Sequence, residues 1–78
     1  MPNIDKFYRI KIYIYNNEHP PPHLHAIYNE FEALFDIVSS RKIAGDLPVN
    51  QMRQVNAWIK ENTESALKNF YELNPRIK

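Results

Sequence analysis

The 78-residue sequence predicts an α+β fold in which a small antiparallel sheet is followed by helix. Side chains alternate between two faces within residues 7–15, 23–28 and 31–38, with an apolar set on one face, which is typical of strands with one buried face. After Pro48, apolar residues recur at helical spacings of three and four. Gly45, the one glycine, separates the two patterns and marks the exit from the sheet. We therefore expect a single domain, residues 1–78, with three to four strands and one long or two short C-terminal helices packed on one sheet face.

The first strand is expected at residues 7–15, where β-branched and aromatic residues alternate with charged ones. Residues 23–28 and 31–38 predict two more strands, joined at Asn29 because asparagine tolerates the positive φ of a tight turn. A short fourth strand is expected at residues 42–44. The sheet face toward the helix would then carry Tyr8, Ile10, Ile12, Ile14, Leu24, Ala26, Tyr28, Phe31, Ala33, Phe35 and Ile37.

The helical pattern begins after Pro48. Proline suits a helix start, because the N–H that it lacks would have no partner in the first turn. Its apolar stripe comprises Met52, Val55, Ile59, Ala66, Phe70 and Leu73, widened by Trp58 and Leu67. Asn62 and Thr63 interrupt this stripe. They predict either one kinked helix or a second helix capped by Thr63, and Pro75 ends the element.

All three histidines lie in the run His19-Pro20-Pro21-Pro22-His23-Leu24-His25. Consecutive prolines fix φ and donate no backbone hydrogen bond, so this run is expected to form an extended, semi-rigid arm. His23 and His25 are two residues apart, and in an extended chain both imidazoles point to the same side. Such a display suggests metal binding, proton transfer or anion recognition.

Acid–base chemistry on RNA is one hypothesis for this arm. His23 and His25 would act as the acid and base, while Arg9 and Lys11 stabilise charge on the phosphate. Aromatic side chains on the same sheet face would stack on exposed bases, and these are Tyr13 and Tyr15. A net charge of +1 gives little general affinity for nucleic acid, so any binding must come from local charge.

A metal site is a second hypothesis, in which His19, His23 and His25 hold Zn²⁺ or another divalent transition metal. The ordinary structural alternative needs no cofactor, because His25 then hydrogen-bonds a carboxylate on the neighbouring strand. The absence of cysteine excludes disulfides and thiolate ligands.

Protein association is a third hypothesis. Aromatic and apolar side chains on the uncovered sheet face would form a patch that soluble monomers usually avoid, so we expect a partner protein or a homo-oligomer. No apolar run approaches the roughly 20 residues of a membrane span, and the first residues lack the apolar core of a signal peptide. We therefore expect a cytoplasmic protein without a membrane partner.

The segment His19–Ala26 resembles the His-x-Pro-Pro-His-x-His-Ala pattern of a family of small bacterial proteins catalogued as domain of unknown function 4160. Similarity extends to residues 7–15, to Gly45–Pro48, to Trp58 and to Leu67–Phe70. Two positions depart from the family, which has histidine where this chain has Asn62 and tryptophan where it has Phe70.

The resemblance implies one half of a toxin–antitoxin-like pair, whose partner is a small cognate protein encoded nearby. The leading hypothesis is accordingly a component of a toxin–antitoxin-like module that acts on RNA through the histidine-bearing arm. A non-catalytic protein-binding or regulatory module and a metal-binding protein are the alternatives.

Overall fold

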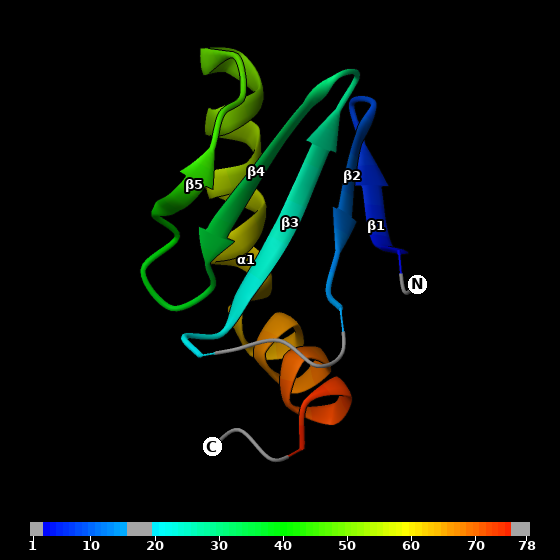
Figure 1. Ribbon diagram of the computed structural model, residues 1–78, viewed down its shortest axis with the longest axis vertical. Coiled ribbons are helices and arrows are strands. Elements are labelled where there is room, and N and C mark those ends of the chain that lie inside the picture. The colour runs from blue at the N-terminus through cyan, green and yellow to red at the C-terminus, as the bar shows by residue number, and fades with distance from the viewer. Residues whose placement is uncertain (1–2, 16–19, 76–78) are drawn as a thin grey trace.

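The computed structural model describes residues 3–15 and 20–75, with only the backbone described for the first two of these residues. A five-stranded antiparallel sheet, in the order β1-β2-β3-β4-β5, precedes one C-terminal helix (Figure 1). The elements are β1 (Asn3–Phe7), β2 (Ile10–Tyr13), β3 (His23–Tyr28), β4 (Phe31–Asp36), β5 (Lys42–Gly45) and α1 (Val49–Leu73). The expected α+β fold is confirmed, but the sheet has five strands rather than three to four.

The additional strand arises because residues 7–15 form a hairpin and not a single strand. β1 ends at Phe7, Tyr8 and Arg9 form the turn, and β2 begins at Ile10. Both turn residues have left-handed backbone angles, with φ of 49° at Tyr8 and 65° at Arg9. Such turns favour Asn-Gly, so a Tyr-Arg pair gives no turn signal in the sequence. Tyr8 is consequently 73% exposed instead of lying under the helix.

The hydrophobic core lies between the sheet and α1, as the alternation predicts. Its buried members are Ile10, Ile12, Ile14, Leu24, Ala26, Ala33, Phe35, Ile37, Leu47, Val55, Ile59, Ala66 and Phe70. Two residues expected on the covered face are less protected, since Tyr28 is half-buried and Phe31 is exposed. Trp58 packs against the core from the helix side, as expected of an apolar stripe residue.

The helix is kinked at Asn62, whose φ of −125° and ψ of 22° are not helical. Here Asn62 Nδ2 donates to the Trp58 carbonyl at 2.8 Å, and Thr63 Oγ1 donates to the Ile59 carbonyl at 2.7 Å. Side chains that bond back to the carbonyl four residues earlier compete with the helical ladder and bend it. The predicted kink is confirmed, with Thr63 bonding backward. Beyond it, the second half of α1 turns beneath the end of the sheet where β2 ends and β3 begins (Figure 1).

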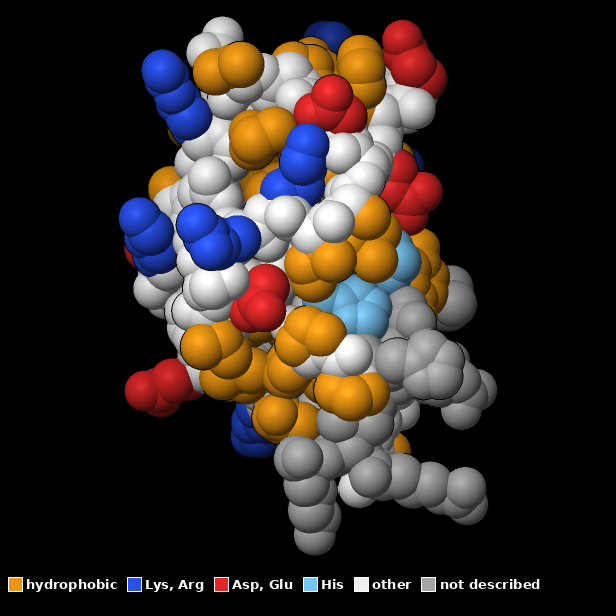
Figure 2. Space-filling model, turned by 60° about the vertical axis from the view of Figure 1, so that its left-hand side comes forward, with side chains coloured by type: hydrophobic (Ala, Val, Ile, Leu, Met, Phe, Trp, Pro, Cys, Tyr) orange, Lys and Arg blue, Asp and Glu red, His pale blue; other side chains and the backbone are white. Residues whose placement is uncertain are grey.

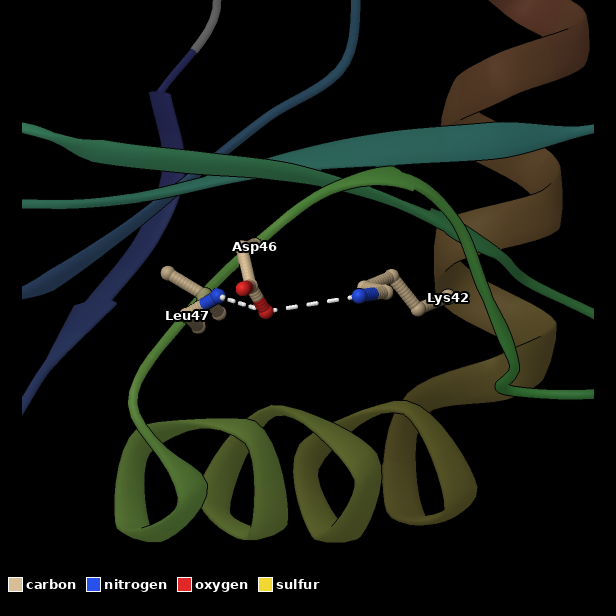
Figure 3. Close-up of polar contacts among 3 residues, drawn as sticks. All are labelled: Lys42, Asp46 and Leu47. Atoms are coloured by element: carbon tan, nitrogen blue, oxygen red, sulfur yellow. Dashed lines mark hydrogen bonds and ion pairs between the residues drawn. The ribbon is translucent and has the colours of Figure 1, made fainter.

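The connection from β5 to α1 is fixed by Gly45 and Asp46. Gly45 has φ of +76° and lies against the Glu32 carbonyl, where a Cβ atom would collide. The Asp46 N–H donates to that same carbonyl at 3.1 Å. The Asp46 carboxylate accepts hydrogen bonds from the Leu47 N–H at 3.1 Å and from Lys42 Nζ at 3.3 Å (Figure 3). Among the described residues, no helix combines the length and the apolar character that crossing a bilayer requires.

Candidate functional site

The sheet face turned away from the core, here called the open face, gathers the ionisable side chains of β2, β3 and β4. Residues paired across antiparallel strands project to the same side, so the register defines which side chains are neighbours. One row across the open face contains Lys6, Lys11, Ile27 and Glu32, and the next contains Tyr13, His25, Leu34 and Ala44. His23 and Asp36 form a third row.

His25 is held between a carboxylate and an aromatic ring. Its Nδ1 atom lies 3.1 Å from Glu32 Oε2, and the Tyr15 ring meets the imidazole edge-on with centroids 4.4 Å apart. The His25 side chain is 14% exposed, whereas that of Glu32 is 49% exposed. When Nδ1 carries the proton it donates to Glu32, and the basic lone pair is then on Nε2. This contact is the hydrogen bond to a neighbouring-strand carboxylate that the structural alternative predicts, and a carboxylate orients a histidine base in the same way.

His23 lies deeper than His25 and contacts the helix. It is 8% exposed, and its ring centroid is 5.5 Å from that of Phe70 in the second half of α1. Its Nδ1 atom lies 2.8 Å from the Pro21 carbonyl, so Nδ1 carries a hydrogen and donates a hydrogen bond to that carbonyl. The two imidazole centroids are 5.6 Å apart. Burial and the bond to Pro21 favour a positioning role for this residue.

Carboxylates near the imidazoles differ in what they bind. Glu32 contacts His25, but Asp36 Oδ1 accepts backbone hydrogen bonds from Val38 at 2.8 Å and Ser39 at 3.0 Å. Asp36 thereby closes the turn after β4. Within residues 3–15 and 20–75, no group of three or more His, Asp or Glu side chains is arranged to hold a metal ion. Of the predicted metal ligands, His23 and His25 are adjacent, and His19 lies outside the described residues.

Three cations line one surface pocket of about 280 Å³ at the end of the hairpin, here called the cation pocket. Lys6 comes from β1, Arg9 from the turn and Lys11 from β2. Ile27 and Asn29 complete the lining, which includes no carboxylate. The structure therefore places the predicted Arg9 and Lys11 together in a pocket that is also lined by Ile27, two positions from His25 on β3.

The two tyrosines predicted for the open face stack on each other. The rings of Tyr13 and Tyr15 have centroids 5.9 Å apart and are nearly parallel, at 8°. Tyr13 is also the cross-strand partner of His25. The pair forms an aromatic wall beside the imidazole. Figure 2 shows histidine side chains at the molecular surface with hydrophobic side chains on either side of them.

Sequence reasoning missed Lys6 and Asn29 in this region. Lys6 was outside the first expected strand, and only the hairpin makes it the cross-strand partner of Lys11. The sequence predicts a turn at Asn29, and its φ of 53° confirms this. Its place in the cation pocket depends on how the ends of two hairpins meet. A lysine just before the alternating segment was the one available signal.

Comparison with known proteins identifies a family for this chain. A family model described as "Domain of unknown function (DUF4160)" matches residues 8–71. This range covers most of the sheet and nearly all of α1. No curated protein and no solved structure matches the chain.

Proposed function

The chain belongs to the DUF4160 family, and we propose that it is the RNA-directed component of a toxin–antitoxin-like two-protein module. One observation carries this proposal: the His25–Glu32 pair and the three-cation pocket share the open face. His25 and the pocket residue Ile27 are two positions apart on β3, a separation of about 7 Å. The long side chains of Arg9 and Lys11 can span this separation and reach a phosphate whose neighbouring 2′-hydroxyl lies at His25.

His25 is the proposed base for cleavage of the RNA backbone. With its Nδ1 proton donated to Glu32, the Nε2 lone pair takes the proton of a ribose 2′-hydroxyl. The 2′-oxygen forms a bond to the adjacent phosphorus, and the bond from phosphorus to the 5′-oxygen breaks. A water molecule protonates the leaving oxygen, and the resulting hydroxide takes the proton from the His25 imidazolium, which restores both. The products are a 2′,3′-cyclic phosphate and a 5′-hydroxyl. Arg9 and Lys11 stabilise the negative charge that builds on the phosphoryl oxygens.

The other open-face residues support this chemistry by position. The acid role predicted for His23 stays a prediction, and its burial against Phe70 favours holding the arm in place. Tyr13 and Tyr15 offer a stacked aromatic wall against which an unpaired base packs. No cofactor is needed for this reaction. The cognate protein of the module would suppress it by covering the open face.

Induced expression with His25 and Glu32 variants tests the proposal. We expect the wild-type chain to arrest bacterial growth and the purified protein to leave cyclic phosphate ends on single-stranded RNA. His25→Ala should lower cleavage by about 100-fold or more, as expected for loss of a general base. Glu32→Gln should lower it by about 10-fold or more, because the imidazole loses its orienting carboxylate. Glu64→Gln, an exposed carboxylate on α1, is the matched control and should leave cleavage unchanged.

Two results would contradict this mechanism. Growth arrest that survives His25→Ala would remove the imidazole from the chemistry. Unchanged growth, combined with tight binding to the protein encoded nearby, would assign the chain to the non-catalytic regulatory class.

Divalent metal binding is a second candidate function. It is favoured by the hydrogen-bond partners of the Nδ1 atoms of both imidazoles. His23 Nδ1 contacts the Pro21 carbonyl and His25 Nδ1 contacts the Glu32 carboxylate, which is how metal-ligating histidines are usually held. Zn²⁺ bound by the two Nε2 atoms, with the predicted His19, would be the simplest site. Calorimetry with Zn²⁺ on protein without a histidine tag should then show binding that His25→Gln removes. Absence of heat with the wild-type chain would contradict it.

A further inference from the structure

The β1–β2 turn uses two residues that are unfavourable for its backbone geometry. Tyr8 and Arg9 both occupy the left-handed region, with φ of 49° and 65°. Asparagine and glycine adopt these angles far more readily than an aromatic or a long cationic residue. Residues held in such conformations cluster at functional sites. We therefore expect the side chains at this turn to have a functional role.

Tyr8 lines an aromatic groove on one side of the turn. The groove has a volume of about 330 Å³ and is formed by Phe7, Tyr8, Gln54, Ala57, Trp58 and Glu61. Phe7 stacks on Trp58 with centroids 6.2 Å apart, and Tyr8 meets Phe7 edge-on at 6.3 Å. Trp58 is fixed in turn, because its Nε1 atom donates to Asp5 Oδ2 at 2.6 Å. The groove thus has a rigid inner wall and an exposed tyrosine at its edge.

Arg9, the next residue, lines a different surface. It contributes to the cation pocket together with Lys6 and Lys11. Two consecutive residues of one tight turn therefore line different surfaces, Tyr8 the aromatic groove and Arg9 the cation pocket. We propose that this turn binds one nucleotide of single-stranded RNA, with the base stacked on Tyr8 in the aromatic groove and the adjoining phosphate in the cation pocket. This inference rests on the proposed function and names the substrate class of the same site.

The aromatic groove suits the base of a nucleotide, and the cation pocket suits its phosphate. Every base has a flat π-face that packs on an aromatic side chain, and a phosphate binds where several cations converge. Glu61 adds a carboxylate to the groove, which disfavours phosphate there and accepts hydrogen bonds from exocyclic amino groups. Bases carrying an amino group are therefore preferred over uracil.

The bound RNA must be single-stranded. In a duplex the bases are stacked inside and paired, so their faces do not reach a tyrosine on a protein surface. A cationic peptide from a partner protein is the other occupant that aromatic walls attract. Lys6 and Arg9 flank Phe7 and Tyr8 in the chain, and their positive charges repel such a peptide, which favours the nucleotide.

Binding measured on a His25→Ala background tests the inference without cleavage. Trp58, the single tryptophan, reports occupancy of the groove by its fluorescence. We expect a short single-stranded RNA to bind about 10-fold tighter than a duplex of the same sequence. Tyr8→Asn should remove most of that preference, since loss of one stacking contact weakens binding by about 10-fold. Asparagine tolerates positive φ, so this substitution keeps the turn.

Two further variants separate base stacking from phosphate binding. Arg9→Asn should weaken single-stranded and duplex RNA alike and lower the slope of log affinity against log salt by about one. Tyr71→Asn is the matched control, because Tyr71 is an exposed tyrosine of α1 that does not line the groove. It should leave both affinities unchanged.

The outcomes distinguish this inference from the proposed function. RNA binding that is equal for both forms and unchanged by Tyr8→Asn overturns the nucleotide site and leaves RNA as the target of the open face. Absence of binding to any RNA overturns both. Quenching by an arginine-rich peptide, without a response to RNA, also overturns both and assigns the groove to a protein partner.

Discussion

Gly45 lies directly against the backbone carbonyl of Glu32, the residue whose carboxylate contacts His25. The single glycine of the chain therefore determines how closely β5 approaches the strand that carries Glu32. A position outside the open-face chemistry thus bears on the orientation of the candidate base. Tests of the site should include this contact as well as the imidazole itself.

Gly45→Ala should destabilise the fold by about 2 kcal/mol or more. The new Cβ meets the Glu32 carbonyl, and the left-handed backbone adds a cost of roughly 1–2 kcal/mol. Urea denaturation followed by circular dichroism measures the change. Ala44→Ser, on the neighbouring exposed position, should stay within about 0.5 kcal/mol of the wild type. Equal stability of Gly45→Ala and the wild type would mean that β5 does not approach β4 this closely.

Asn74→Ala should cost about 1–3 kcal/mol, because it removes the side-chain donor to the Tyr15 and Phe70 carbonyls. Asn74 is 4% exposed, and its Nδ2 atom donates to the Tyr15 carbonyl at 2.9 Å and to the Phe70 carbonyl at 3.0 Å. Since Tyr15 packs on His25, the imidazole resonances should move in an NMR spectrum at constant pH. Asn69→Ala, on the same helix, serves as the comparison. An unchanged His25 signal in Asn74→Ala would separate the helix end from the site.

Trp58→Phe should destabilise the chain by about 1 kcal/mol through the lost hydrogen bond to Asp5. The stack on Phe7 is largely retained by the smaller ring. Combining this change with Asp5→Ala, which removes the acceptor, in a double-mutant cycle isolates the interaction. We expect the two effects to be less than additive. Additive effects would indicate that the indole and the carboxylate do not interact in solution.

Phe70→Trp should destabilise the fold by about 1–3 kcal/mol, although it restores the residue that the family resemblance suggests. Phe70 is fully buried and contacts His23 and Tyr71, so a larger ring must displace its neighbours. Phe70→Leu would instead leave a gap, and it provides the opposite change in volume. A stabilised Phe70→Trp variant would show that the space between α1 and β3 is larger than described.

Alternation predicted much of the sheet because the physical rule behind it is simple. A strand with one buried face needs an apolar residue at every second position, and Leu24 and Ala26 satisfy this in β3. The kink of α1 was predictable for a related reason. Asn62 and Thr63 interrupt the apolar stripe, and both side chains bond back to helical carbonyls.

The hairpin at Tyr8 and Arg9 was not predictable from the same rule. Alternation runs through the turn without a break, and the left-handed angles fall on residues that rarely adopt them. The candidate site was predictable only where its residues are close in the sequence. His23 and His25 share a strand, so their proximity follows from local spacing, whereas the pairing of Lys6 with Lys11 depends on the missed turn.

The sheet order has a consequence for when the sheet and the candidate site form during synthesis of the chain. Each strand pairs with its neighbour in sequence, so hairpins form from local contacts and close rapidly. The contacts that hold the candidate site are long-range instead. Asn74 donates a hydrogen bond to the Tyr15 carbonyl, 59 residues earlier in the chain. A nascent chain that has not reached this asparagine has its strands but lacks the helix end that packs on His23. An activity that depends on that packing would therefore be withheld until translation has passed this point.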